Sequence, residues 1–99
     1  MSRIITAEQC IENANISYWA RKDGHTVTER ETGETFQLFD HELRWAAEKI
    51  AKGHVKVNRT LRRDIAAGLG AEDFGIWGDE SETLDVIIQV ACFEEIVYG

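Results

Sequence analysis

The stretch DESETLDVIIQVACFEEIVY, residues 79–98, decides the fold of this chain. It opens with polar residues that favour a helix start and continues with an apolar run. At helical spacing, one face carries Leu84, Ile87, Ile88, Ala91 and Glu95, and the flanks carry Val86, Val90, Phe93 and Val97. A helix that is apolar over most of its circumference is normally buried on several sides. We therefore predict a central helix over 79–98, which the rest of the chain must cover.

The composition is that of an ordinary globular protein. The 99 residues are 43% hydrophobic and 29% charged, with a mean hydropathy of -0.32, and we expect one domain, residues 1–99. No apolar run reaches the roughly 18 residues of a membrane span, because Asp85, Gln89, Glu94 and Glu95 interrupt the best candidate. The segment MSRIITAEQC lacks the apolar core of a secretory signal, so we expect a cytoplasmic protein that uses no membrane.

The two cysteines are expected to be structural. Cys10 and Cys92 both fall at apolar positions of predicted helices. In a reducing cytosol we expect buried thiols that act as small hydrophobic residues, rather than a disulfide. The chain has no proline, so caps and glycines must set the ends of its helices.

A first helix is predicted over residues 7–20. Thr6 and Gln9 have the spacing of a capping box, and apolar residues follow at helical intervals as far as Tyr18. The turn at 22–24 would end the helix. Asparagines at 13 and 15 weaken it, so a break there stays open, and in that case residues 16–20 would be a strand.

Residues 25–40 are predicted to form a β-hairpin. The segments 26–31 and 34–39 are rich in β-branched and aromatic residues, and they flank Gly33, which can supply the positive φ of a tight turn. Phe36 and Leu38 alternate with less apolar positions, so one face of the hairpin is more apolar than the other. Two strands alone are marginally stable, and this face must therefore lie on helices.

A second helix is predicted to follow the hairpin directly. Asp40 is a suitable N-cap residue, and Gly53 lies where a helix-ending glycine is favoured. The apolar stripe of this helix consists of Leu43, Ala46, Ala47 and Ile50.

A third helix is predicted over 61–69. Asn58 or Thr60 would cap it, and Gly70 would end it. The preceding residues 54–58 would be a connector or an extra edge strand, and 71–78 would be a loop. The predicted fold class is α+β: a helix, a β-hairpin, then three helices packed as one compact domain with a central C-terminal helix.

Charge is distributed unevenly along the chain. The formal charge is -7 in total, but residues 1–43 carry -4, residues 44–63 carry +6 and residues 64–99 carry -9. The last segment contains no lysine or arginine. The basic and acidic segments could face each other and neutralise, or either could bind a partner.

The acidic segment is our first candidate binding site. Its residues are Glu72, Asp73, Trp77, Asp79, Glu80, Glu82 and Asp85. Acids in the first turn of the last helix also have a structural reason, because they complement the helix dipole. As a functional site, they would form an acidic patch with Trp77 as an aromatic anchor. Such a patch suits a basic protein surface, including one that binds nucleic acid.

The basic segment 44–63 is the alternative site. Its candidate patch consists of Lys52, Lys56, Arg59, Arg62 and Arg63. Followed by small residues and a glycine turn, this patch faintly resembles the first half of a helix-turn-helix. A recognition helix should follow that turn, but Glu72 and Asp73 come next and would repel phosphate. Nucleic-acid binding is therefore the second hypothesis.

No pattern in the sequence indicates catalysis. His25, His41 and His54 have no partner at helical spacing, and neither cysteine has a nearby metal-ligand companion. Phosphate-loop, zinc-protease and nucleophile-elbow motifs do not occur. We expect no metal, no cofactor and no enzymatic activity, and an enzyme whose site is invisible in the sequence is the third hypothesis.

The favoured expectation is thus a non-enzymatic interaction or inhibitor protein. In size and charge, the chain is similar in general character to phage-encoded inhibitors of host defence, including anti-CRISPR proteins. The acidic patch, rather than this general likeness, predicts a protein partner whose basic surface binds nucleic acid. A homodimer also stays open, because the apolar last helix could form half of a dimer interface.

Overall fold

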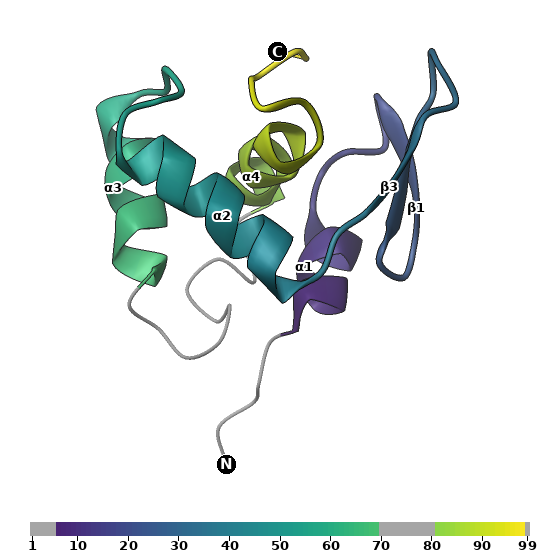
Figure 1. Cartoon of the computed structure of the whole chain (residues 1–99), viewed down its shortest axis with the longest axis horizontal. Coiled ribbons are helices and arrows are strands. Elements are labelled where there is room, and N and C mark those ends of the chain that lie inside the picture. Colours follow the sequence, from purple (N-terminus) through teal and green to yellow (C-terminus); the bar gives the residue numbers. More distant parts are fainter. Residues whose placement is uncertain (1–5, 70–80, 99) are drawn as a thin grey trace.

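The computed structural model describes residues 6–69 and 81–98. In chain order its elements are α1 (Ala7–Asn13), β1 (Ala20–Asp23), β2 (Thr26–Glu29), β3 (Thr35–Gln37), α2 (Asp40–Ala51), α3 (Arg59–Gly68) and α4 (Ser81–Phe93). The sheet lies at one end of the molecule and α3 at the other, with α2 and α4 between them (Figure 1). The described residues thus confirm a compact α+β fold.

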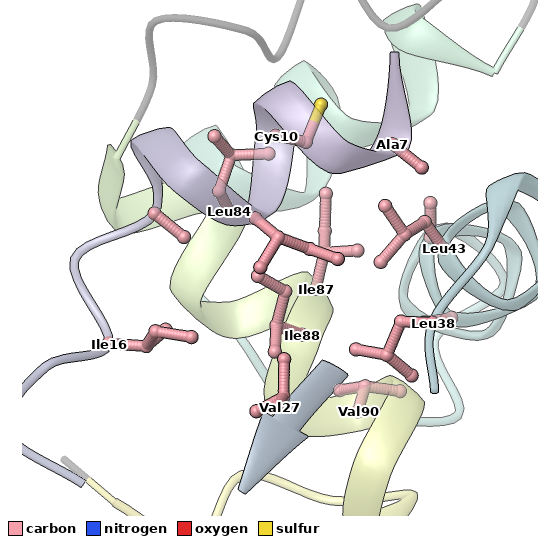
Figure 2. Packing of buried hydrophobic residues seen from close by; sticks show 14 of the residues in the cluster. Ala7, Cys10, Ile16, Val27, Leu38, Leu43, Leu84, Ile87, Ile88 and Val90 are labelled. Atoms are coloured by element: carbon pink, nitrogen blue, oxygen red, sulfur yellow. The ribbon is translucent and has the colours of Figure 1, made fainter. Parts of the chain in front are cut away.

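Helix α4 is central, as predicted. It packs against α2 and α1, and its apolar side chains join those of the sheet in one buried cluster. Figure 2 shows labelled side chains from α1, β2, α2 and α4 converging there. Burying a large apolar side chain contributes about 1.5–3 kcal/mol to stability. The fully buried Leu84, Ile87 and Ile88 therefore make α4 the main support of the core.

The last helix is shorter than predicted. It ends at Phe93, because Glu94 adopts a left-handed φ of 63°. The chain then turns back, and the backbone N–H groups of Val97 and Tyr98 donate to Oε1 of Gln89 at 2.9 and 2.8 Å. The prediction of a helix through residue 98 is therefore wrong, since a side chain of the helix supplies hydrogen bonds to a non-helical tail. The predicted start at 79 lies outside the described residues.

Helix α1 is also shorter than predicted. Its capping box is present, because Thr6 Oγ1 accepts from the Gln9 N–H at 3.2 Å and Gln9 Oε1 accepts from the Thr6 N–H at 3.0 Å. The helix ends at Asn13, where the Nζ of Lys22 donates to the carbonyl oxygens of Glu12 and Ala14. The prediction of a helix to residue 20 is wrong, because the chain leaves the helix at the asparagines.

The sheet contains one strand more than the predicted hairpin. Its order is β1-β2-β3, with all neighbours antiparallel. The predicted hairpin is β2 and β3, in which Val27 pairs with Phe36 and Gly33 has a φ of +75°. The unpredicted β1 occupies 20–23, so the alternative of a strand over 16–20 places it too early, and the predicted turn at 22–24 is largely strand. Gly24, with a φ of +61°, starts the loop to β2.

Helix α2 has the predicted buried stripe but not the predicted cap. Its N-cap is Phe39, whose N–H donates to Oε1 of Glu42 at 3.0 Å, and Asp40 is already helical. The reason is that Glu42 supplies the capping acceptor from within the helix. The buried stripe consists of Leu43, Ala46, Ala47 and Ile50. Gly53, with a φ of +82°, ends the helix as predicted.

Helix α3 begins two residues before its predicted start. Asn58 is the cap, since its Oδ1 accepts from the Leu61 N–H at 2.7 Å, and the helix therefore starts at Arg59. Residues 54–58 are a connector without strand structure. The predicted stop at Gly70 and the predicted loop 71–78 lie outside the described residues.

Candidate functional site

The structure describes two residues of the predicted acidic patch. Glu82 lies exposed in the first turn of α4, and Asp85 follows three positions later on the same side of the helix. The other members, Glu72, Asp73, Trp77, Asp79 and Glu80, lie outside the described residues. The described part of the candidate site therefore lies on α4 and on the elements that surround its first half.

Glu82 and Asp85 both line a groove of 540 Å³. Its other lining residues come from the segment between α1 and β1 (Asn15 and Tyr18), the start of α3 (Asn58 and Leu61), α4 (Val86 and Gln89) and the C-terminal tail (Ile96 and Tyr98). None of these described lining residues is a lysine or an arginine. The groove thus joins two carboxylates to neutral polar groups and an apolar wall.

Asp85 is the centre of a hydrogen-bond network. Its Oδ2 accepts from the Tyr18 hydroxyl at 2.6 Å, and its Oδ1 accepts from Nε1 of Trp19 at 2.9 Å and from Nε2 of Gln89 at 3.0 Å. Trp19 is 2% exposed, so its indole N–H would otherwise be left unpaired. These bonds connect α4 to the segment that precedes β1. Asp85 is therefore a structural residue as well as a member of the groove.

Tyr18 stands at the edge of the groove with 52% of its surface exposed. Burial of the hydroxyl and its hydrogen bond to Asp85 raise the pKa of Tyr18 to about 12. The hydroxyl therefore stays protonated at neutral pH and donates a hydrogen bond to the carboxylate of Asp85. Nε2 of Gln89 donates a long hydrogen bond of 3.5 Å to the same hydroxyl oxygen, so one of its two lone pairs is left to accept from a ligand.

Gln89 is a lining residue of the groove that the sequence did not reveal. It is 1% exposed, and its side-chain amide bonds to Asp85 on one side and to the C-terminal tail on the other. In the sequence it is simply an interruption of an apolar run. The sequence did contain one indication of this role, a single amide side chain within a helix predicted to be buried. A buried polar group needs hydrogen-bond partners.

The C-terminal tail forms one wall of the groove, and its residue Tyr98 is held by both the sheet and α4. The ring of Tyr98 stacks on Trp19, with centroids 5.3 Å apart and planes inclined by 11°. Its hydroxyl donates to the buried Glu29, and this hydrogen bond is the main reason that the pKa of Tyr98 is raised. Gln89 holds the backbone of the same residue, so the tail joins the sheet to α4.

The predicted basic patch is exposed, and Lys52 also lines a hollow of 220 Å³ together with Trp45 and Lys49. Lys52, Lys56, Arg59, Arg62 and Arg63 are all exposed at the end of α2 and along α3. Lys52 pairs with Glu48 at 2.9 Å. Nε of Arg62 donates to the Ala51 carbonyl at 3.1 Å, so this guanidinium helps to cap α2. Two of the five basic side chains therefore have partners within the chain.

The described residues offer little support for catalysis or membrane insertion. Across 6–69 and 81–98, no group of three histidine, cysteine or acidic side chains is placed to hold a metal ion. In these ranges no helix combines the length and apolarity needed to cross a bilayer. Cys10 and Cys92 form no disulfide, and burial is the main reason that the pKa of Cys92 is raised to about 12. A reactive thiolate is therefore disfavoured at Cys92.

Comparison of the chain with family models, with curated proteins and with solved structures finds no match.

Proposed function

We propose that this protein is a non-enzymatic interaction protein, which binds the basic surface of a partner through the acidic residues of its C-terminal third. The observation that carries this proposal is the groove beside α4. Two carboxylates line it, and no described basic residue does. The chain from 64 to 99 adds a formal charge of -9 without any lysine or arginine, so a basic partner would be attracted over a wide area.

The partner's surface is proposed to be one that binds nucleic acid. Carboxylates spaced along a helix can occupy positions that phosphates would otherwise fill. The protein would then act as an inhibitor, because it competes with nucleic acid for the same basic residues. Electrostatic steering would make association fast and sensitive to salt.

Affinity capture from host lysate with matched variants tests this function. Wild-type protein should retain a nucleic-acid-binding protein at low salt, and both high salt and added duplex DNA should release it. The triple variant Asp79→Lys, Glu80→Lys, Glu82→Lys should lose the partner. Glu34→Lys makes the same kind of charge reversal on an exposed hairpin residue and should retain it.

Circular dichroism and thermal unfolding of each variant separate a lost contact from a lost fold. A partner that the correctly folded triple variant retains with unchanged affinity would refute the proposal. If added DNA does not release the partner, the partner still binds the acidic protein, but competition with nucleic acid is refuted.

Binding of nucleic acid by the basic patch is the second candidate function. The observation in its favour is that Lys56, Arg59 and Arg63 are exposed close together in sequence around the start of α3. A gel shift of DNA or RNA that weakens steeply with added salt would support it. Absence of any shift at low salt would exclude it.

A further inference from the structure

We propose that the groove beside α4 receives an arginine side chain of the partner, with its guanidinium against Asp85, Tyr18 and Glu82. This inference rests on the proposed function and specifies the chemistry of its central contact.

The charge of the groove selects a cation. Glu82 and Asp85 project from the same side of α4, and both line the groove. Every other described lining residue is neutral. A cation inside the groove would therefore meet two carboxylates without a competing positive charge. An anionic ligand would be repelled for the same reason.

The free hydrogen-bonding capacity of the groove selects a donor. A carboxylate offers about four lone-pair positions, and donors within the protein occupy three of those on Asp85. The position that remains belongs to Oδ2, beside the hydroxyl oxygen of Tyr18, which keeps one lone pair besides the one that accepts from Gln89 at 3.5 Å. A guanidinium donates hydrogen bonds and accepts none, so its chemistry matches these two neighbouring acceptors.

The walls of the groove suit the rest of an arginine side chain. Leu61, Val86 and Ile96 offer apolar surface for its methylene groups. The exposed ring of Tyr18 offers a flat face to the planar guanidinium. Arginine stacks on aromatic rings and donates in a fixed planar fork, whereas the lysine ammonium is a strongly hydrated point charge. Arginine is therefore the better match.

The acceptors are already fixed before a ligand arrives. Buried Trp19 and buried Gln89 hold the Asp85 carboxylate from one side, and Tyr18 holds it from the other. A ligand would therefore bind without ordering this carboxylate first, which lowers the entropic cost of association.

Nuclear magnetic resonance titration with an oligoarginine peptide tests the inference, and an oligocitrulline peptide of equal length is the neutral control. The indole N–H of Trp19 donates to Asp85, so its resonance reports on the groove. Oligoarginine should shift this resonance, and oligocitrulline should not. The indole resonance of Trp45, which lies in α2 with Lys49 over its ring, should stay in place. The chain has three tryptophans, so the variants Trp45→Phe and Trp77→Phe together assign the three indole signals.

Matched variants locate the bound cation. Glu82→Gln removes one carboxylate from the groove and should weaken oligoarginine binding about fivefold, the upper range for an exposed ion pair. Glu34→Gln removes an exposed carboxylate from the hairpin and should leave binding within twofold of wild type. Both side chains are exposed, so neither change should impair folding.

The outcomes separate this inference from the proposed function. Equal shifts with oligocitrulline, or unchanged affinity of Glu82→Gln, would overturn the arginine site. Oligoarginine binding that leaves the Trp19 signal unmoved would also overturn it, although the acidic protein would still bind basic surfaces. Failure of wild-type protein to bind oligoarginine at low salt would refute both proposals.

Discussion

The groove beside α4 and the basic surface of α2 and α3 are both charged, but their charged groups are held differently. In the groove, Asp85 accepts three hydrogen bonds from side chains and stands beside an apolar wall. On the basic surface, Lys52 forms an exposed pair one turn along the same helix, and Arg62 covers the end of α2. Charge alone thus distinguishes a binding site poorly. A charge held in place by several hydrogen bonds is the stronger indication.

Replacing Gln89 by leucine should cause the largest loss of stability. Leucine has a similar volume but no amide, so the N–H groups of Val97 and Tyr98 and the Tyr98 carbonyl would lose their partners. We expect a loss of about 3 kcal/mol in the free energy of unfolding, measured by urea denaturation. Gln37→Leu, on the exposed side of β3, is the matched control and should change little. Equal effects of the two substitutions would show that the tail does not depend on Gln89.

Replacing Asp85 by alanine should cost about 2 kcal/mol, because the buried indole N–H of Trp19 would be left unpaired. Glu82→Ala removes the other groove carboxylate, but this side chain is exposed, so we expect a loss of only about 0.5 kcal/mol. Thermal and urea unfolding of the pair measure the difference. If both variants lost the same stability, Asp85 would be no more important for the fold than the exposed Glu82.

Alkaline pH should weaken the hydrogen-bond network of Asp85 in the groove. The pKa of Tyr18 rises from an ordinary value of 10.0 in the unfolded chain to about 12 in the fold. Its contribution to stability is therefore fully present below pH 10.0 and is lost as the pH rises through about 12. The absorbance of tyrosinate follows this ionisation, and Tyr18→Phe should leave a single tyrosine, Tyr98, to titrate. A wild-type protein whose tyrosines both ionise near pH 10.0 would contradict the network.

The smallest effect is expected on the basic surface. Lys52→Ala breaks the exposed pair with Glu48 and should change the free energy of unfolding by less than about 0.5 kcal/mol. Differential scanning calorimetry measures this change. A loss above about 1 kcal/mol would show that the basic surface contributes to stability as the groove does, and would contradict the comparison.

The elements that the sequence predicted well are those with local causes. The capping box of Thr6 and Gln9, the cap at Asn58 and the glycine turn at Gly33 each depend on residues a few positions apart. The stripe of α2 follows from helical periodicity in the same way. Such features are visible because the interacting groups are neighbours along the chain.

The elements that the sequence missed depend on distant partners. Strand β1, with the sequence ARKD, has no apolar alternation, and its pairing with β2 gives it strand structure. The network of Asp85 joins residues 66 and 67 positions apart, so Glu82 and Asp85 could be proposed from charge, whereas Tyr18 could not. The early end of α4 likewise depends on the tail returning to Gln89.

The contact between Gln89 and the tail also has a consequence for how the chain can be handled. A side-chain amide carries the same donor and acceptor as a peptide bond, so Gln89 pairs with Tyr98 as a neighbouring backbone would. The segment 94–98 thereby gains a ladder-like pairing with a side chain of α4. Deleting residues 94–98 would leave the side-chain amide of Gln89 without these partners and would remove one wall of the groove. An affinity tag for the capture experiments therefore belongs at the amino terminus.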